Sequence, residues 1–118
     1  MKFTVLGSAS SFGTPAAGGF WGSCDPAEPR NRRNRASLLV ESQTTRILVD
    51  ATPDLRHQLN DFNIGHLDGV LLTHSHSDHI NGMDDLRALA LNNNKPVDVF
   101  GDQDTIDEIA RRWPYIFK

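Results

Sequence analysis

Cysteine is almost absent from this chain of 118 residues, which contains only Cys24. A single cysteine cannot form a disulfide within the chain, and such scarcity is typical of proteins from a reducing compartment. Long apolar runs are also missing, because none approaches the roughly 20 residues that a membrane-spanning helix needs. The N-terminal apolar segment ends at Gly7, too early for a signal peptide. We therefore expect a cytoplasmic protein that makes no membrane contact.

A strong excess of either charge is missing as well. Twelve basic and 15 acidic residues give a formal net charge of −3 and a pI near 5.9. The electrostatic field of the whole chain, which has a net negative charge, therefore gives no reason to expect non-specific binding of nucleic acid. The 38% hydrophobic and 23% charged residues are ordinary for a globular protein, and the length limits the chain to one domain.

Apolar patterns and turn residues predict the order of the secondary structure. The first strand is followed by a long irregular segment rich in Gly, Ser, Pro and Asn, of the kind that is often functional. Thr52 is the expected cap of the first helix, with Pro53 in its first turn. The order of strands followed by alternating helices and strands predicts a layered α/β domain. Strands are expected at 3–6, 37–41, 46–50, 69–73 and 97–100, and helices from Thr52 to Gly65, at 83–91, and from Asp102 or Asp104 through Ala110.

A dense group of metal-ligand residues follows the apolar run 69–73, which is typical of a strand covered on both faces. His74 and His76 are two apart, so in an extended segment they point the same way and can bind one ion. Asp78 and His79 follow a turn and can face a second ion. Imidazole and carboxylate suit zinc, manganese or iron(II), and two such ions side by side activate water. We predict these four residues as metal ligands, with Asp78 and His79 also catalytic.

The stretch His74-Ser75-His76-Ser77-Asp78-His79 resembles the His-x-His-x-Asp-His signature of the metallo-β-lactamase superfamily, whose fold is a four-layer αβ/βα sandwich. Asp50, at the end of the strand 46–50, resembles the family aspartate that contacts the metal ligands and supports them without binding the metal itself. The Gly/Ser-rich segment 7–15, and then 21–26 and 31–35, resemble the PhnP-like phosphodiesterase branch. Isolated histidines are more often ordinary surface or core residues, and we interpret His57 and His66 in that way.

The resemblance implies two divalent ions, zinc or manganese, the first held by His74 and His76 and the second by Asp78 and His79. The family completes its site with later histidines and a bridging aspartate, but no histidine follows His79 here. We therefore expect residues 1–118 to be the N-terminal half of a single metallo-β-lactamase-like domain. A longer protein, or a second copy in a homodimer, would supply the remaining ligands. Some members of the branch hold a structural zinc through several cysteines, which Cys24 alone cannot do.

The implied function is hydrolysis of a small phosphodiester, either nucleotide-like or a ribosyl (cyclic) phosphate. A thioester or lactone hydrolase, an RNA-processing nuclease of the same fold, and an inactive metal-binding fragment are the alternatives. Guanidinium groups can grip phosphate, but an arginine cluster can equally pair with neighbouring acids on a solvated loop. The candidate substrate contacts are Ser10, Ser11 and Arg33, and the arginine cluster comprises Arg30, Arg32, Arg33 and Arg35.

Overall fold

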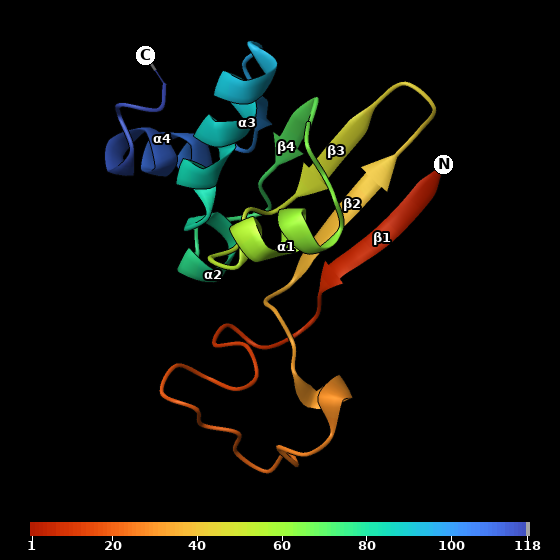
Figure 1. The fold of residues 1–118 in the computed structure, drawn as a ribbon. Helices are drawn as coiled ribbons and strands as arrows, with labels where there is room; N and C mark the ends of the chain where they lie inside the picture. Colours follow the sequence, from red (N-terminus) through yellow and green to blue (C-terminus); the bar gives the residue numbers. More distant parts are fainter. Residues whose placement is uncertain (118) are drawn as a thin grey trace.

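The computed structural model describes residues 1–117 and shows a five-stranded mixed sheet with helices on one face (Figure 1). The strands lie in chain order across the sheet. The first three are antiparallel neighbours, and the last three are parallel. The strands are β1 (Lys2–Gly7), β2 (Ser37–Glu41), β3 (Arg46–Val49), β4 (Gly69–Leu71) and β5 (Asp98–Phe100). The helices are α1 (Leu55–Asp61), α2 (Ser77–Ile80), α3 (Leu86–Asn93) and α4 (Gln103–Arg112), with short 3-10 turns η1 (Pro29–Asn31) and η2 (Met83–Asp85).

The five strand predictions are confirmed to within two residues at each end. The largest difference is at β4, which ends at Leu71, two residues earlier than predicted, while β3 ends at Val49, one residue earlier. Asp50 leaves the strand in the left-handed region, with φ 66°. This backbone conformation is uncommon for a residue other than glycine, although aspartate tolerates it better than most.

The first helix begins at Leu55, two residues after Pro53, the expected first helical residue after the cap Thr52. Thr52 and Gln58 explain the difference, since both are completely buried. The hydroxyl of Thr52 accepts the backbone N–H of Asp54 at 3.0 Å and donates to Oε1 of Gln58 at 2.9 Å. Thr52 therefore forms a buried bridge across the first turn, rather than an exposed cap before it.

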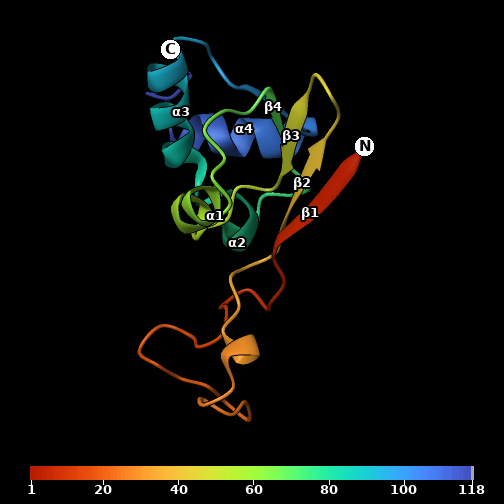
Figure 2. The ribbon, with the colours of Figure 1, turned by 45° about the vertical axis from the view of Figure 1, so that its right-hand side comes forward.

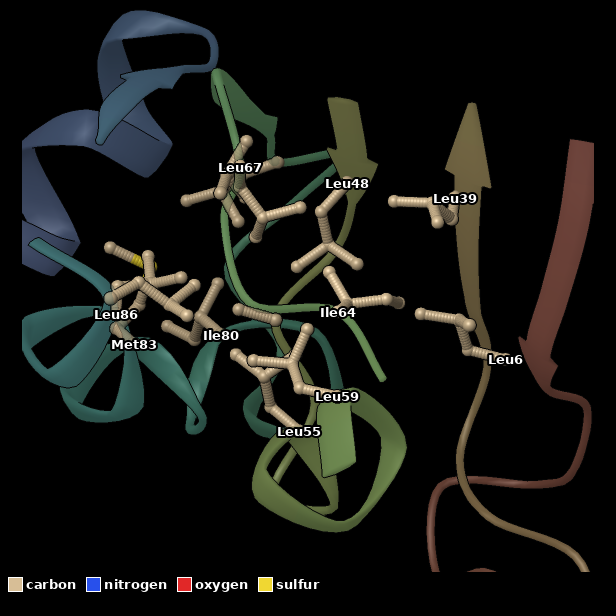
Figure 3. Close-up of a cluster of buried hydrophobic side chains, with 14 of the residues drawn as sticks. Leu6, Leu39, Leu48, Leu55, Leu59, Ile64, Leu67, Ile80, Met83 and Leu86 are labelled. Carbon is tan, nitrogen blue, oxygen red and sulfur yellow. The ribbon is translucent and has the colours of Figure 1, made fainter. Parts of the chain in front are cut away.

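The hydrophobic core lies between the helices and one face of the sheet (Figure 3). Leu39, Leu48 and Val70 are aligned across β2, β3 and β4 by the strand register, and all three are buried. The helical layer covers them from one side, as the turned view shows (Figure 2). Its buried residues are Leu55, Leu59, Ile80, Met83, Leu86, Leu89 and Ile109. The core therefore fixes α1 and α2 against the ends of the central strands.

The other face of the sheet is apolar and open. Strand alternation and register place Phe3, Val5, Leu71 and Phe100 on this face. Their exposed fractions are 63%, 62%, 44% and 52%. The expectation that both faces of β4 are covered is therefore wrong for this chain, because Leu71 is exposed. Within residues 1–117, the helices are all too short or too polar to cross a lipid bilayer.

Close backbone packing at Gly82 yields a test of this arrangement. A Cβ atom at this position would lie 2.0 Å from the carbonyl oxygen of Thr52 and 2.9 Å from Cβ of Leu55. We expect Gly82→Ala to lower the free energy of unfolding by about 1–3 kcal/mol, as overpacking usually does. Urea unfolding followed by circular dichroism measures the change. Gly65→Ala is the matched control, because a Cβ there meets nothing within 4 Å. Equal losses in both variants would contradict the packing described here.

Candidate metal centre

The four predicted ligands lie just beyond the end of β4, beside the end of β3. These two strands are parallel, so their C-terminal ends meet at the same edge of the sheet. The segment between β4 and α2 carries His74 and His76, and α2 carries Asp78 and His79. Two backbone hydrogen bonds fix α2 to the chain after β3, from Ala51 N–H to the carbonyl of His79 and from Gly82 N–H to the carbonyl of Ala51, both at 2.9 Å.

A buried carboxylate, that of Asp50, connects the two strand ends to α2. It is 5% exposed and accepts the backbone N–H of Thr73 at 2.8 Å. The hydroxyl of Thr73 lies 2.8 Å from Oδ2 of Asp50, and Nδ1 of His79 lies 2.7 Å from the same oxygen. Since a carboxylate only accepts hydrogen bonds, Nδ1 of His79 carries a proton, and in the neutral tautomer Nε2 presents a lone pair on the far side of the ring.

The same reasoning sets the orientation of His74. The Thr73 hydroxyl donates its single proton to Asp50, so it can only accept from Nδ1 of His74, which lies 2.9 Å away. In its neutral tautomer, His74 therefore also presents the lone pair of Nε2. Thr73 was not recognised from the sequence, although its place between a strand and the histidine motif is the signal that could have identified it.

The imidazole rings gather closely. The ring centroid of His74 lies 4.6 Å from that of His76 and 4.1 Å from that of His79. Nε2 of His79 lies 3.1 Å from Oδ2 of Asp78, and both side chains are 19% exposed. In the neutral tautomer with the proton on Nδ1, His79 directs the lone pair of Nε2 towards Asp78, and these two electron-rich atoms can share a cation.

The donor set of three imidazoles and one carboxylate fits zinc or manganese. The rings contact each other edge-on or tilted. Within residues 1–117, groups of three or more His, Cys, Asp or Glu side chains do not converge on one point as ligands of a single ion would. The chemical character and proximity of these residues therefore fit a metal centre. Their role as ligands stays a prediction.

A second set of buried polar contacts connects this centre to the long first loop. Nε2 of Gln58 donates to the carbonyl of Arg35 at 2.9 Å, while Oε1 accepts from Thr52. The backbone N–H of Arg35 is bound by Oδ2 of Asp54 at 2.9 Å. Gln58 was not recognised from the sequence, although a glutamine between Leu55 and Leu59 lies on the buried stripe of α1.

The first loop carries the candidate substrate contacts, and Arg33 lies against its early part. Ser10 and Ser11 are exposed, and the carbonyl of Ser11 accepts Nε of Arg35 at 2.9 Å. Nη1 of Arg33 donates to the carbonyl of Ser8 at 3.3 Å. Within the arginine cluster, Arg30 pairs with Glu28 and Arg35 with Asp54. Two of its members therefore form ion pairs with neighbouring acids.

A polar contact after the histidine motif shifts two pKa values. The Tyr115 hydroxyl donates to Oδ1 of Asp84 at 2.9 Å, and Arg87 lies 3.1 Å from the same oxygen. The hydrogen bond from Tyr115 and then that from Arg87 lower the pKa of Asp84. The same contact with Asp84 raises the pKa of Tyr115. These exposed groups fasten the C-terminal segment to η2.

Known proteins resemble this chain in sequence. Residues 45–118 match the family model described as "Beta-lactamase superfamily domain". An octanoyltransferase of Porphyromonas gingivalis is 38% identical over 119 residues, covering 100% of this chain and 24% of that protein. A ribonuclease Z of a Bradyrhizobium species is 39% identical over 87 residues, covering 70% of this chain and 29% of that protein.

Solved structures resemble it in fold. A diphosphatase from the PhnP family has a TM-score of 0.89 and 35% identity, covering 98% of this chain and 46% of that one. Zn²⁺-bound PqqB from Methylobacterium extorquens has a TM-score of 0.70 and 22% identity, covering 96% and 41%. The chain thus spans about a quarter of the two curated relatives and less than half of the two solved chains. It belongs to the beta-lactamase superfamily, has part of the metallo-β-lactamase fold, and resembles the PhnP-like branch of that superfamily.

Proposed function

We propose that the protein carrying this chain is a metal-dependent hydrolase of small phosphodiesters, nucleotide-like or ribosyl (cyclic) phosphates. The observation that carries the proposal is the placement of His79, whose Nδ1 is bound by Asp50 while its Nε2 faces Asp78 at 3.1 Å. The similarity to a PhnP-family diphosphatase over 98% of the chain favours phosphate chemistry over the other reactions of this fold.

His74 and His76 are the proposed ligands of one divalent ion, and Asp78 and His79 those of a second, either zinc or manganese. When bound, such a pair supplies Lewis-acid activation of water and neutralises charge on a phosphate group. Asp50 keeps His79 in the tautomer that can donate a lone pair, and Thr73 does the same for His74. Asp78 and His79 are the proposed catalytic residues, because their side chains lie together, with Nε2 of His79 at 3.1 Å from Oδ2 of Asp78.

We further propose that residues 1–118 form the N-terminal half of a single domain, whose remaining donors lie outside this chain. The first loop begins where β1 ends, at the same edge of the sheet as the histidine motif (Figure 1). Ser10, Ser11 and Arg33 are the proposed substrate contacts on this loop. Their exposed backbone and side-chain donors suit a polar, anionic substrate.

Hydrolysis of an acyl thioester is the second candidate. It is favoured by the 38% identity to an octanoyltransferase over the whole chain, since that relative is named for transfer of an acyl group. A pair of metal ions that activates water can hydrolyse thioesters and phosphodiesters alike. The fold alone therefore does not select between these two substrate classes. An RNA-processing role is favoured by the similarity to a ribonuclease Z, but the net charge of −3 disfavours a nucleic-acid substrate.

Metal binding can be tested by elemental analysis after dialysis against zinc. We expect the protein to retain zinc, and His76→Ala or Asp78→Ala to reduce the amount retained, because each removes a proposed ligand. His57→Ala and His66→Ala are matched controls, since both histidines lie elsewhere on the surface. Retention of no zinc, or equal losses in the control variants, would leave an inert fragment as the better description.

Orientation of His79 can be tested with Asp50→Asn. An amide oxygen still accepts a hydrogen bond, but the charge that supports the imidazole is lost, so we expect zinc affinity to fall about 10–100-fold. Competition with a fluorescent zinc chelator measures the affinity. Asp61→Asn on the exposed end of α1 removes the same charge away from the centre and should leave affinity unchanged. An unaltered affinity in Asp50→Asn would remove Asp50 from the metal centre.

Substrate class can be tested by comparing turnover of bis(p-nitrophenyl) phosphate with that of an octanoyl thioester and a lactone. The zinc- and manganese-loaded forms of the full protein are to be used. We expect turnover of the phosphodiester to exceed that of the acyl substrates, and to be lost in Asp78→Ala. A higher kcat/KM for the thioester would replace the phosphodiesterase proposal with the acyl one.

A further inference from the structure

A hollow lies beside β1 and the first loop, and none of the histidines lines it. Its volume is about 780 Å³, and its walls come from the end of β1, from both arms of the loop and from Asp54. This volume lies within the range of about 300–1,000 Å³ that small-molecule sites occupy. Four arginines line it: Arg30, Arg32, Arg33 and Arg35.

The four arginines are not equivalent. Arg30 is neutralised by Glu28, and Arg35 by Asp54 at 3.4 Å. Among the residues that the structure describes, Arg32 and Arg33 have no carboxylate partner. The guanidinium of Arg32 lies 5.2 Å above the ring of Trp21, and Arg33 uses one nitrogen to hold the carbonyl of Ser8. The pocket therefore carries uncompensated positive charge, although the chain as a whole is acidic.

We propose that this pocket binds a phosphate or diphosphate group of a small molecule through Arg32 and Arg33, separately from the metal centre. Each guanidinium retains several free N–H donors, which suit bidentate binding of phosphate oxygens. Stacking on Trp21 holds Arg32 in place without neutralising it.

The backbone around the pocket is held firmly enough to present these groups. The pocket wall at Gly7 packs against the carbonyl of Arg35 and the amide of Gln58, so closely that a Cβ at Gly7 would lie 2.2 Å from the first and 2.7 Å from the second. Gln58 and Asp54 fix the backbone of Arg35, and through Thr52 they reach the segment that carries Asp50. The pocket and the histidine motif are thus connected through one short segment, 50–58.

This inference rests on the proposed function in one respect, because it takes the bound anion to be a second charged group of the hydrolase substrate. A substrate with two anionic groups would place one in the pocket and the other at the metal centre. A small molecule is favoured over RNA, because the positive charge is confined to a concavity of limited volume. A long polyanion would need a basic stripe that extends beyond the pocket, whereas the chain as a whole has a net charge of −3.

The pocket can be tested without metal, so that its failure is distinct from failure of the hydrolase proposal. Inorganic diphosphate is titrated into the full chain in the presence of EDTA, and binding is followed by isothermal calorimetry. We expect Arg32→Gln and Arg33→Gln each to weaken binding about tenfold, the loss of one charge-assisted contact. Added salt should weaken binding to the unaltered protein, because the contacts are exposed.

Arg111→Gln is the matched control, since it removes the same charge from α4, where Arg111 pairs with Glu108. It should bind diphosphate as the unaltered protein does. Circular dichroism of Arg32→Gln tests whether the variant is folded. We expect an unchanged spectrum, because this side chain makes a stacking contact rather than a hydrogen bond that holds the loop.

Four results would overturn the proposal. These are unchanged affinity in both pocket variants, equal weakening in Arg111→Gln, binding that requires zinc, and tighter binding of a single-stranded RNA oligonucleotide with the same dependence on Arg32 and Arg33. The third would assign the anion to the metal centre, and the fourth would replace the small molecule by RNA.

Discussion

The Asp50 carboxylate is the interaction on which the candidate centre depends. It is buried and accepts hydrogen bonds from the backbone and hydroxyl of Thr73 and from the ring of His79. A buried carboxylate without such partners would be costly, so the contacts are mutually required. They join the end of β3, the segment after β4 and helix α2 at one point. The left-handed backbone of Asp50 is what turns its side chain out of the strand and toward both partners.

The constraint extends from Asp50 along the chain to the first loop. Ala51 binds the carbonyl of His79, Thr52 binds Gln58, and Gln58 binds the carbonyl of Arg35. Each of these contacts is buried or partly buried, and hydrogen bonds in such surroundings are stronger than those exposed to water. The loop that lines the arginine pocket and the motif that carries the histidines are therefore positioned by the same short segment, so the proposed anion pocket and the proposed metal centre share one support.

Much of this arrangement could be predicted from local sequence patterns. The strands and their order follow from apolar alternation, and the gathering of His74, His76 and His79 follows from their spacing after β4. The start of α1 could not be predicted, because the role of Thr52 depends on Gln58, which is buried only once α1 packs against the sheet. The division of the arginine cluster into paired and unpaired members likewise depends on contacts distant in sequence, such as the pairing of Arg35 with Asp54.

The open face of the sheet bears on how the centre is completed. Phe3, Val5, Leu71 and Phe100 form an apolar surface on the side opposite the helices. The αβ/βα sandwich has four layers, of which this chain provides one helical layer and one sheet, and it spans 46% of the PhnP-family diphosphatase chain. A second sheet packed on the open face would bury these side chains. In the proposed half-domain arrangement, the same packing would bring the loops of the second sheet to the edge that carries the histidines, so burial of the apolar face would accompany completion of the proposed ligand set.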